Sequence, residues 1–482
     1  MSRIYISAAH KSSGKTTLSI GLCAALHQKG FVVQPFKKGP DYIDPLWLSR
    51  ASERACHNLD FNTMSDDEIL RTMGRYAQGA DVSIIEGNKG LYDGVALDGS
   101  DSNAAVAKLT QSPIILVIDT RGVTRGVAPL LKGYQDFDNE INIAGVIYNL
   151  SNGGRHEDKL RAVTEEYTDI PVLGVVKKNT LLEIDERHLG LMPSNESEEV
   201  EQKINDIANI VAESVDLDAL MAIAESAPIL DIDEVIRFDS LNIKHELSDK
   251  QEEKLRIGIC EDQAFGFYYE GDKQALRDAG AELISINTLE DEKLPDNLDG
   301  LFIGGGFPET QMQALANNTA MRYHLKKAIE AGLPTYAECG GLMYLSQSLH
   351  WNGQSAPMVG IIPADAKMYA KPQGRGYVEL EETSDMLWKD NSDLDGSETN
   401  RVKAHEFHYS RLESMDKEIL SKKGKFAYKV HRGVGITGEY DGWVYKNLLA
   451  TYAHMRDTDN FHWSRRFVDF IRQNKSIASK VK

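Results

Sequence analysis

A cysteine set between small residues is the first sign of chemistry in this chain. Residues 335–345 read TYAECGGLMYL, so Cys339 follows a short apolar segment and precedes two glycines and a helix-like run. Such a turn between a strand and a helix exposes its side chain, and the helix N-terminus favours a thiolate. We therefore predict that Cys339 is a nucleophile that attacks the amide of glutamine and releases ammonia through a glutamyl thioester.

A nucleophile of this kind needs hydrogen-bond donors for the oxyanion that forms during the attack. Residues 301–309 read LFIGGGFPE, which predicts a strand that ends in a glycine loop. Backbone N–H groups of Gly305 and Gly306 would form half of an oxyanion hole, and the N–H of Gly340 would form the rest.

A histidine must carry the proton, and the candidates are His405, His408 and His454. We favour His454, because residues 449–453 form an apolar run typical of a late strand that delivers the histidine. His405 and His408 lie in the run AHEFHYS and are left open as structural or substrate-facing residues.

A second kind of chemistry is indicated near the N-terminus. Residues 4–20 read IYISAAHKSSGKTTLSI, which predicts a strand, a phosphate loop and the start of a helix. Ala9 occupies the first glycine position of the usual P-loop spacing. Backbone amides at the helix start would bind phosphates, Lys15 would neutralise their charge, and the Thr16 hydroxyl would bind Mg²⁺. The residues predicted to bind ATP are Ser12, Ser13, Gly14, Lys15, Thr16 and Thr17, with Asn149 either pairing with adenine or acting as a turn residue.

Two segments with carboxylates follow the next two predicted strands of the sheet. They read FKKGPDYIDP at 36–45 and IEGNKGLYDG at 85–94. Because Mg²⁺ prefers hard oxygen ligands, we predict Asp41, Asp44 and Glu86 as magnesium ligands beside Thr16. Lys37 and Lys38 are predicted to receive substrate carboxylates. Turn chemistry is the alternative for both segments, since Gly-Pro-Asp and Tyr-Asp-Gly are common turns.

Composition excludes several classes of protein. The chain has 482 residues, and its net charge of −19 argues against a nucleic-acid surface. The four cysteines have no CxxC spacing, which argues against a zinc site or a disulfide framework. No run of about 18 apolar residues suggests a membrane span, and the first residues lack the features of a signal peptide. We expect a cytoplasmic protein without nucleic-acid or membrane partners.

The order of predicted elements indicates an α/β fold with mostly parallel sheets. Strand-like and helix-like segments alternate through the first half and again after residue 254. The predicted domains are a P-loop ATP-binding domain at 1–191, a connector with helical segments at 192–253, and a second α/β domain at 254–475. The predicted strands cover 3–8, 32–36, 82–86, 114–119, 143–148, 172–176, 255–260, 282–286, 300–303 and 334–337.

Taken together, the motifs resemble those of the cobyrinic acid a,c-diamide synthase family over nearly the whole chain. The matching stretches are AAHKSSGKTT, PFKKGPDYIDP, IIEGNKGLYDG, VIDTRG, DERHLGL, FGFYYEGDKQAL, FIGGGFPE, AECGGLMYL, AHEFHYS and YAHM. The resemblance implies an N-terminal domain of the dethiobiotin-synthetase type joined to a class I glutamine amidotransferase domain. It implies that ATP and Mg²⁺ activate the a and c acetates of cobyrinic acid as acyl phosphates, which ammonia from glutamine converts to amides during cobalamin biosynthesis.

The same resemblance implies roles for single residues. It makes His454 the partner of Cys339, and makes Asp41, Asp44 and Glu86 residues of ATP–Mg²⁺ binding or substrate activation. The chain also departs from the family pattern. Arg456 stands where many class I amidotransferases have a glutamate, so we expect His454 to be oriented differently, and residues 11–13 read Lys-Ser-Ser in place of Ser-Gly-Val.

One further departure bears on the substrate. Asn88 and Lys89 replace an apolar pair in a loop that we expect to face the macrocycle. Sirohaem and nickel-sirohydrochlorin are therefore alternative tetrapyrrole substrates. An alternative from another class is a ParA-like nucleotide switch with an inactive amidotransferase domain. Its signature would be a lysine five residues before Lys15, and this chain has His10 there, which argues against it. The sequence leaves the oligomeric state open, with a homodimer as one option.

Overall fold

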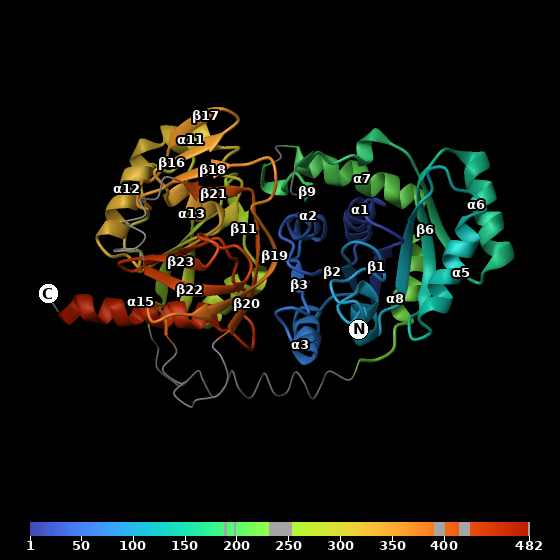
Figure 1. Cartoon of the computed structure of the whole chain (residues 1–482). Coiled ribbons are helices and arrows are strands. Elements are labelled where there is room, and N and C mark those ends of the chain that lie inside the picture. Colours follow the sequence, from blue (N-terminus) through green and yellow to red (C-terminus); the bar gives the residue numbers. More distant parts are fainter. Residues whose placement is uncertain (188–189, 197–198, 231–252, 390–400, 414–424, 481–482) are drawn as a thin grey trace. The chain divides into compact units, whose positions relative to one another are not determined.

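The computed structural model describes residues 1–187, 190–196, 199–230, 253–389, 401–413 and 425–480. The chain divides into two compact units, residues 1–248 and residues 249–482 (Figure 1). Each unit is built on its own large β-sheet, so the expected α/β fold class is confirmed. No helix in the described part of the chain combines the length and apolar character needed to cross a membrane.

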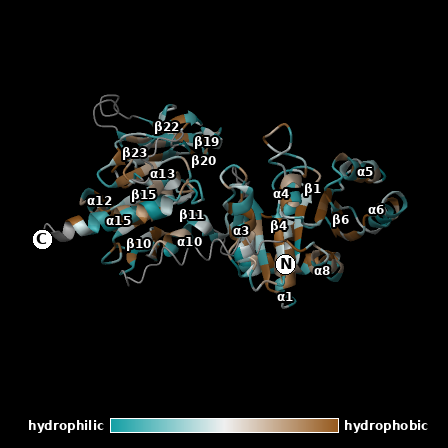
Figure 2. Ribbon diagram, turned by 90° about the horizontal axis from the view of Figure 1, so that it is seen from below, coloured by the Kyte–Doolittle hydropathy of each residue, from teal (hydrophilic) through white to brown (hydrophobic). Residues whose placement is uncertain are grey.

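The N-terminal unit has a parallel sheet with the strand order β3-β2-β4-β1-β5-β6-β7. Strands β4 to β7 are rich in Val, Ile and Leu, as expected where helices cover both faces of a sheet, and Figure 2 shows β4 and β6 with much of the hydrophobic colour. Since all strands run the same way, the loops that follow them lie along one edge of the sheet. The strands are β1 (Arg3–Ala8), β2 (Val33–Lys38), β3 (His57–Leu59), β4 (Val82–Glu86), β5 (Ile114–Asp119), β6 (Ile143–Ser151) and β7 (Val172–Lys177).

Helices cover both faces of this sheet. α3 (Asp66–Tyr76), α4 (Asn103–Leu109), α5 (Val127–Phe137) and α6 (Gly154–Tyr167) share one apolar core with it. The other face contacts α1 (Lys15–Gln28) and α8 (Leu217–Glu225), with α2 (Ile43–Ser52) and α7 (Val200–Ser214) packed beside α1. The remaining short elements are η1 (Thr180–Leu182), β8 (Glu186–Arg187), β9 (Gly190–Leu191) and η2 (Ser194–Glu196).

The segment expected as a connector contains two helices that pack on the N-terminal sheet unit. α7 lies along α1, where a Cβ added at Gly21 would stand only 2.4 Å from the Val211 side chain. The glycine therefore permits a close approach of the two helices. The Asp216 carboxylate starts α8 by accepting a hydrogen bond from the Ala219 amide at 2.9 Å. Residues 231–252 of the expected connector lie outside the described residues.

The C-terminal unit has a mixed sheet with the order β12-β10-β13-β15-β24-β23-β22-β19-β20. The first five strands are parallel and the last four pair antiparallel. The strands are β10 (Leu255–Cys260), β12 (Ala281–Ile286), β13 (Gly300–Ile303), β15 (Thr335–Glu338), β19 (Gly374–Glu382), β20 (Arg401–His408), β22 (Lys425–Arg432), β23 (Tyr440–Tyr445) and β24 (Leu448–Thr451). The parallel half, including the late strand before His454, was predicted from the sequence; the antiparallel half was not.

Two apolar cores lie on the two faces of this sheet. One includes α10 (Glu270–Asp278) and α15 (Trp463–Lys480). The other includes α11 (Met312–Asn317), α12 (Thr319–Glu330) and α13 (Gly340–Leu345). Two smaller sheets complete the unit, formed by β11 (Phe265–Phe267) with β14 (Gly305–Gly306), and by β16 (Ser348–Trp351), β17 (Gln354–Pro357), β18 (Asp365–Met368) and β21 (Ser410–Glu413).

Candidate functional site

The loop between β1 and α1 has the backbone of a phosphate-binding turn. Gly14 adopts a left-handed conformation with φ 78°, directly before the first residue of α1. A Cβ at this position would stand 2.2 Å from Nδ2 of Asn149, which donates a hydrogen bond to the Ser13 carbonyl at 3.0 Å. Asn149 therefore holds the loop from the end of β6. Its predicted contact with adenine stays a prediction.

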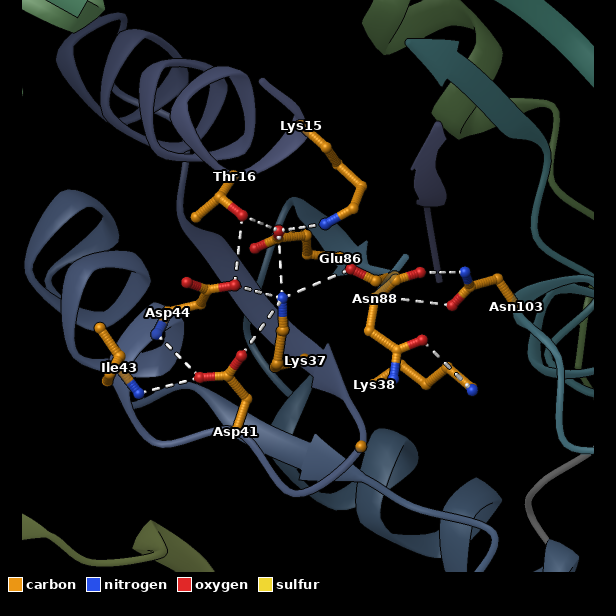
Figure 3. Close-up of polar contacts among 12 residues, drawn as sticks. Lys15, Thr16, Lys37, Lys38, Asp41, Ile43, Asp44, Glu86, Asn88 and Asn103 are labelled. Carbon is orange, nitrogen blue, oxygen red and sulfur yellow. Dashed lines mark hydrogen bonds and ion pairs between the residues drawn. The ribbon is translucent and has the colours of Figure 1, made fainter. Parts of the chain in front are cut away.

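Charged side chains from α1, β2, α2 and β4 meet beside this loop (Figure 3). Oε1 of Glu86 accepts hydrogen bonds from Lys15 Nζ at 2.6 Å and from the Thr16 hydroxyl at 2.7 Å. The Thr16 hydroxyl also lies 3.2 Å from Oδ2 of Asp44. Lys37 Nζ donates to the same Asp44 oxygen at 2.5 Å and lies 3.1 Å from Glu86 Oε1. The loops of separate strands are thus joined into one polar site.

Lys37 supplies the positive charge at the centre of an acidic cluster formed by Asp41, Asp44 and Glu86. Its side chain is only 1% exposed, and Oδ2 of Asp41 lies 3.8 Å from its ammonium nitrogen. Burial alone would lower the pKa of Lys37, but Asp44, Glu86 and Asp41 together raise it well above its ordinary value. Lys37 is therefore kept charged by carboxylates of this chain. Its predicted contact with a substrate carboxylate stays a prediction.

Lys15 shows the opposite balance of burial and charge. Burial lowers the pKa of Lys15, and the neighbouring Glu86 offsets this only in part, while the positive charge of Lys37 adds to the decrease. An ammonium group that is buried and incompletely balanced is stabilised by a further anion. A nucleotide phosphate in the adjacent loop would provide that anion.

The oxygen atoms around Thr16 suit a magnesium ion. The Thr16 hydroxyl and the carboxylates of Asp44 and Glu86 are hard ligands of the type that Mg²⁺ prefers. In the described part of the chain, Oε2 of Glu86 is buried and has no hydrogen-bond partner. No three described His, Cys, Asp or Glu side chains are arranged as a metal site by themselves. The set therefore fits an ion that also takes ligands from phosphate and water.

The loop after β4 carries Asn88 and Lys89, and Lys38 contacts this loop from the end of β2. Lys38 Nζ donates to the Asp101 carbonyl at 2.5 Å and lies 3.5 Å from Oδ1 of Asn88 (Figure 3). Asn103 accepts from the Asn88 amide at 3.0 Å and donates to the Gly90 carbonyl at 2.6 Å. Lys89 is exposed at the tip, with φ 42°. The sequence did not single out Asn103, which holds the loop in place.

In the C-terminal unit, Cys339 stands at a sharp turn between β15 and α13. Its backbone has φ 45° and ψ −98°, and its amide donates to the Thr451 carbonyl at 2.8 Å. A Cβ at Gly341 would lie 2.2 Å from the Ile303 carbonyl oxygen, so the start of α13 requires a residue without a side chain. This is the geometry of the nucleophile elbow that the sequence predicted.

His454 follows β24, the neighbour of β15, and its buried imidazole reaches the elbow. Nδ1 of His454 lies 3.5 Å from Oε2 of Glu338, the residue directly before Cys339. Burial alone would lower the pKa of His454, but the Cys339 sulfur and the Glu338 carboxylate together raise it to about 10. The protonated imidazole is therefore the favoured form. The structure thus brings the two predicted residues, Cys339 and His454, together, with Glu338 beside them, which the sequence did not single out.

The glycines predicted for the oxyanion hole lie beside these two side chains. A Cβ at Gly305 would stand 2.6 Å from Cε1 of His454. A Cβ at Gly340 would stand 3.0 Å from the Gly306 amide nitrogen, so the backbones of the glycine loop and the elbow touch. The structure thus brings Gly305, Gly306 and Gly340 together. Their role as donors stays a prediction.

The other two candidate histidines pack against the segment that carries His454. His405 pairs with His454 through the backbone, accepting from its amide at 2.8 Å, and stacks on its ring with centroids 4.9 Å apart. Burial, followed by the charges of His454 and Arg456, lowers the pKa of His405 well below its ordinary value. His408 stacks on Tyr452 at 3.9 Å. The guanidinium of Arg456 lies over the Tyr269 ring at 5.1 Å.

Comparison with known proteins covers both units. Residues 5–191 match a model described as the CobQ/CobB/MinD/ParA nucleotide binding domain, and residues 256–461 match the CobB/CobQ-like glutamine amidotransferase domain. A cobyrinate a,c-diamide synthase of Magnetococcus marinus is 41% identical over 476 residues, which cover 99% of this chain and 98% of the relative. The enzymes of that name from Archaeoglobus fulgidus and Methanosarcina acetivorans are each 38% identical, covering 97% and 94% of this chain and 96% and 92% of the relatives. The chain therefore belongs to the cobyrinate a,c-diamide synthase family.

Proposed function

We propose that this protein is a ligase that uses ATP and glutamine to convert the a and c acetate carboxylates of cobyrinic acid into amides, a step of cobalamin biosynthesis. The observation that carries the proposal is the presence of two unlike sites in one chain. The N-terminal unit joins a phosphate loop to Glu86 through Lys15 and Thr16. The C-terminal unit places His454 beside the Cys339 elbow. The first site activates a carboxylate and the second supplies ammonia.

In the N-terminal site, we assign ATP phosphates to the backbone amides of residues 12–17 and to the ammonium group of Lys15. Thr16, Asp44 and Glu86 would hold Mg²⁺, with Asp41 nearby, and the ion would neutralise charge on the phosphates. A substrate carboxylate oxygen bonds to the γ-phosphorus as the bond to the β–γ bridging oxygen breaks, which gives an acyl phosphate and ADP. Ammonia then displaces phosphate, a far better leaving group than hydroxide.

In the C-terminal site, the thiolate of Cys339 attacks the glutamine carboxamide carbon. Backbone amides of the glycine loop and of Gly340 bind the oxyanion, and His454 gives its proton to the departing ammonia. Water activated by His454 then hydrolyses the glutamyl thioester and restores the thiol. The raised pKa of His454, about 10, keeps the imidazole protonated before the first step, so it can give a proton to the departing ammonia.

The choice of macrocycle rests on two observations, the family of the chain and the loop after β4. The three relatives described above are named cobyrinate a,c-diamide synthases, which favours cobyrinic acid. The exposed Lys89 beside Asn88 is the specific observation that keeps sirohaem as a second candidate, because a cation at this rim suits a different arrangement of carboxylates. We also propose that the enzyme acts in the cytoplasm, because ATP and glutamine are supplied there. A homodimer is one option for its oligomeric state, which light scattering would test.

Mass spectrometry of the products tests the proposal directly. The purified protein is incubated with ATP, Mg²⁺ and glutamine, with cobyrinic acid and sirohaem offered in parallel reactions. Diamide from cobyrinic acid supports the leading proposal, and amide from sirohaem alone moves the protein to the second candidate. Nucleotide hydrolysis with no amide from either macrocycle, and no glutamine hydrolysis, would instead favour a nucleotide switch.

A further inference from the structure

The carboxylate of Glu338 is held on one side and directed toward His454 on the other. Its Oε1 accepts hydrogen bonds from the Tyr336 hydroxyl at 2.5 Å and from the Met455 amide at 2.8 Å. The second oxygen, Oε2, lies 3.5 Å from Nδ1 of His454, within ion-pair distance. Glu338 is 2% exposed, so water does not compete for the carboxylate. A buried carboxylate is stable as an anion only beside positive charge or donors.

We propose that Glu338 is the positioning residue for His454: its carboxylate holds the Nδ1 side of the imidazole, so that the other ring nitrogen serves the thiol of Cys339. This inference rests on the proposed glutamine hydrolysis and adds a residue to it. The glutamate that many class I amidotransferases carry two residues after the histidine is replaced by Arg456, whose guanidinium lies over Tyr269. Glu338 supplies the missing carboxylate from the other side of the turn.

The other buried carboxylates nearby are committed to different groups. Asp441 accepts from the Thr451 hydroxyl and from the Tyr452 and Ala453 amides, so it shapes the turn that leads to His454. Asp272 accepts from the Asp457 amide at 2.9 Å and from the Trp463 indole at 3.2 Å. Glu338 is the one of these three carboxylates with an ion-pair contact to the His454 ring.

The charges that face His454 come from several elements. Cys339 and Glu338 face it from the end of β15, and His405 stacks on it from β20. Arg456 lies in the same segment, with Tyr269 below it. His405 is held neutral because burial and its charged neighbours lower its pKa. The raised pKa of His454 therefore depends on Cys339 and Glu338, and loss of the Glu338 charge leaves only Cys339 to raise it.

The test uses the full-length protein with Glu338 changed to Gln, which keeps the shape and removes the charge. The pH dependence of Cys339 alkylation by iodoacetamide is followed by peptide mass spectrometry, together with glutaminase activity. We expect glutaminase kcat to fall at least on the order of 10- to 100-fold, the range typical when a carboxylate that orients a metal-bound histidine is removed. We also expect the pH dependence of the alkylation rate to change, because the pKa of His454 falls when Glu338, one of the groups that raise it, loses its charge. Amidation with ammonium salts should be retained.

Asp272→Asn is the matched control, because it also replaces a buried acid of this unit by its amide. Burial, followed by the charge of Asp457, raises the pKa of Asp272 well above its ordinary value, so a neutral amide resembles the favoured form. This variant should keep the wild-type alkylation profile. An unchanged profile and unchanged glutaminase activity in Glu338→Gln would overturn the inference. Absence of glutaminase activity in the wild-type protein would instead overturn the proposed function.

Discussion

The Thr16 hydroxyl donates a 2.7 Å hydrogen bond to Oε1 of Glu86, which ties the start of α1 to the end of β4. The same oxygen accepts from Lys15 at 2.6 Å. Two groups that would bind a phosphate or a magnesium ion, the Lys15 ammonium and the Thr16 hydroxyl, therefore already share one oxygen atom. When a nucleotide binds, the Lys15 ammonium and the Thr16 hydroxyl must turn at least partly from Glu86 toward the phosphates and the magnesium ion. Nucleotide binding is therefore expected to rearrange these hydrogen bonds.

Replacement of Glu86 by Gln should abolish most of the ATP-dependent amidation. The amide keeps the size of the side chain but removes the negative charge that balances Lys15 and Lys37, so we expect a loss on the order of 100-fold. Amide formation would be measured with ammonium salts, which bypass the glutamine site. The exposed Glu53, changed to Gln, is a control that should retain activity. Equal activity of both variants would remove Glu86 from the proposed mechanism.

Removal of divalent cations should separate the two halves of the reaction. With EDTA present, we expect no amide from either glutamine or ammonium salts, because the oxygen ligands around Thr16 are proposed to act with Mg²⁺. Hydrolysis of glutamine should continue, since the Cys339 site is built without metal ligands in the proposed mechanism. Adding magnesium back should restore amidation. Full amidation in EDTA would contradict the magnesium assignment.

Cys339→Ala should stop the use of glutamine and leave the use of ammonia. The substitution removes the sulfur while retaining a small side chain at the elbow, and the N-terminal site is untouched. Amide formation would be compared with glutamine and with ammonium salts at saturating ATP. Loss of both activities in a protein with an unchanged circular dichroism spectrum would argue against two separate sites.

Gly305→Ala should reduce glutamine hydrolysis selectively. Its Cβ would stand 2.6 Å from Cε1 of His454, closer than such atoms pack, so the imidazole or the glycine loop must move. Gly271, in α10, has no atom within 4 Å of an added Cβ and serves as the matched control. We expect Gly271→Ala to keep full activity and to gain up to about 1 kcal/mol of stability, because alanine favours the helix. Similar glutaminase rates in the two variants would contradict the conclusion that Gly305 must lack a side chain because it lies close to the His454 ring.

The ionisation of His454 and His405 should differ sharply in solution. The pKa of His454 is raised to about 10, so its imidazolium contributes stability that is fully present below the unfolded value of about 6.5 and is lost as pH rises through about 10. His405 should stay neutral at pH 7, because its pKa is lowered. Histidine ¹⁵N spectra recorded from pH 5 to 10 would test this. Titration midpoints of about 6.5 for both histidines would contradict the raised pKa of His454 and the lowered pKa of His405.

The sequence predicted the parallel strands well because each is a short apolar run between helical segments. The three-residue β3 was missed, since His57–Leu59 is too short and too polar to stand out. The antiparallel strands were missed for a related reason. In β19, buried and exposed residues alternate imperfectly and two glycines interrupt the pattern, so the segment resembles a loop in sequence alone.

The candidate site was predicted where chemistry is local and missed where it depends on folding. The phosphate loop and the cysteine elbow are continuous motifs, so residue order reveals them. The predicted contact of Lys37 with a substrate carboxylate stays a prediction. The sequence could not show that its side chain, 1% exposed, lies among three carboxylates, because strand pairing places it there. Glu338 was hidden because its partner, His454, is supplied by a distant strand. Arg456, at the position where a glutamate would be expected, indicated only that His454 is oriented differently.

The backbone at Cys339 has a thermodynamic consequence of its own. A residue with a side chain at φ 45° and ψ −98° is strained, typically by about 1–3 kcal/mol, and the rest of the unit must hold it there. Folding alone would favour glycine at this position. The cysteine at this position therefore costs stability that glycine would not, in exchange for a reactive sulfur at the turn. A lineage that no longer needed glutamine hydrolysis would be expected to lose this cysteine early and to become more stable as it did so.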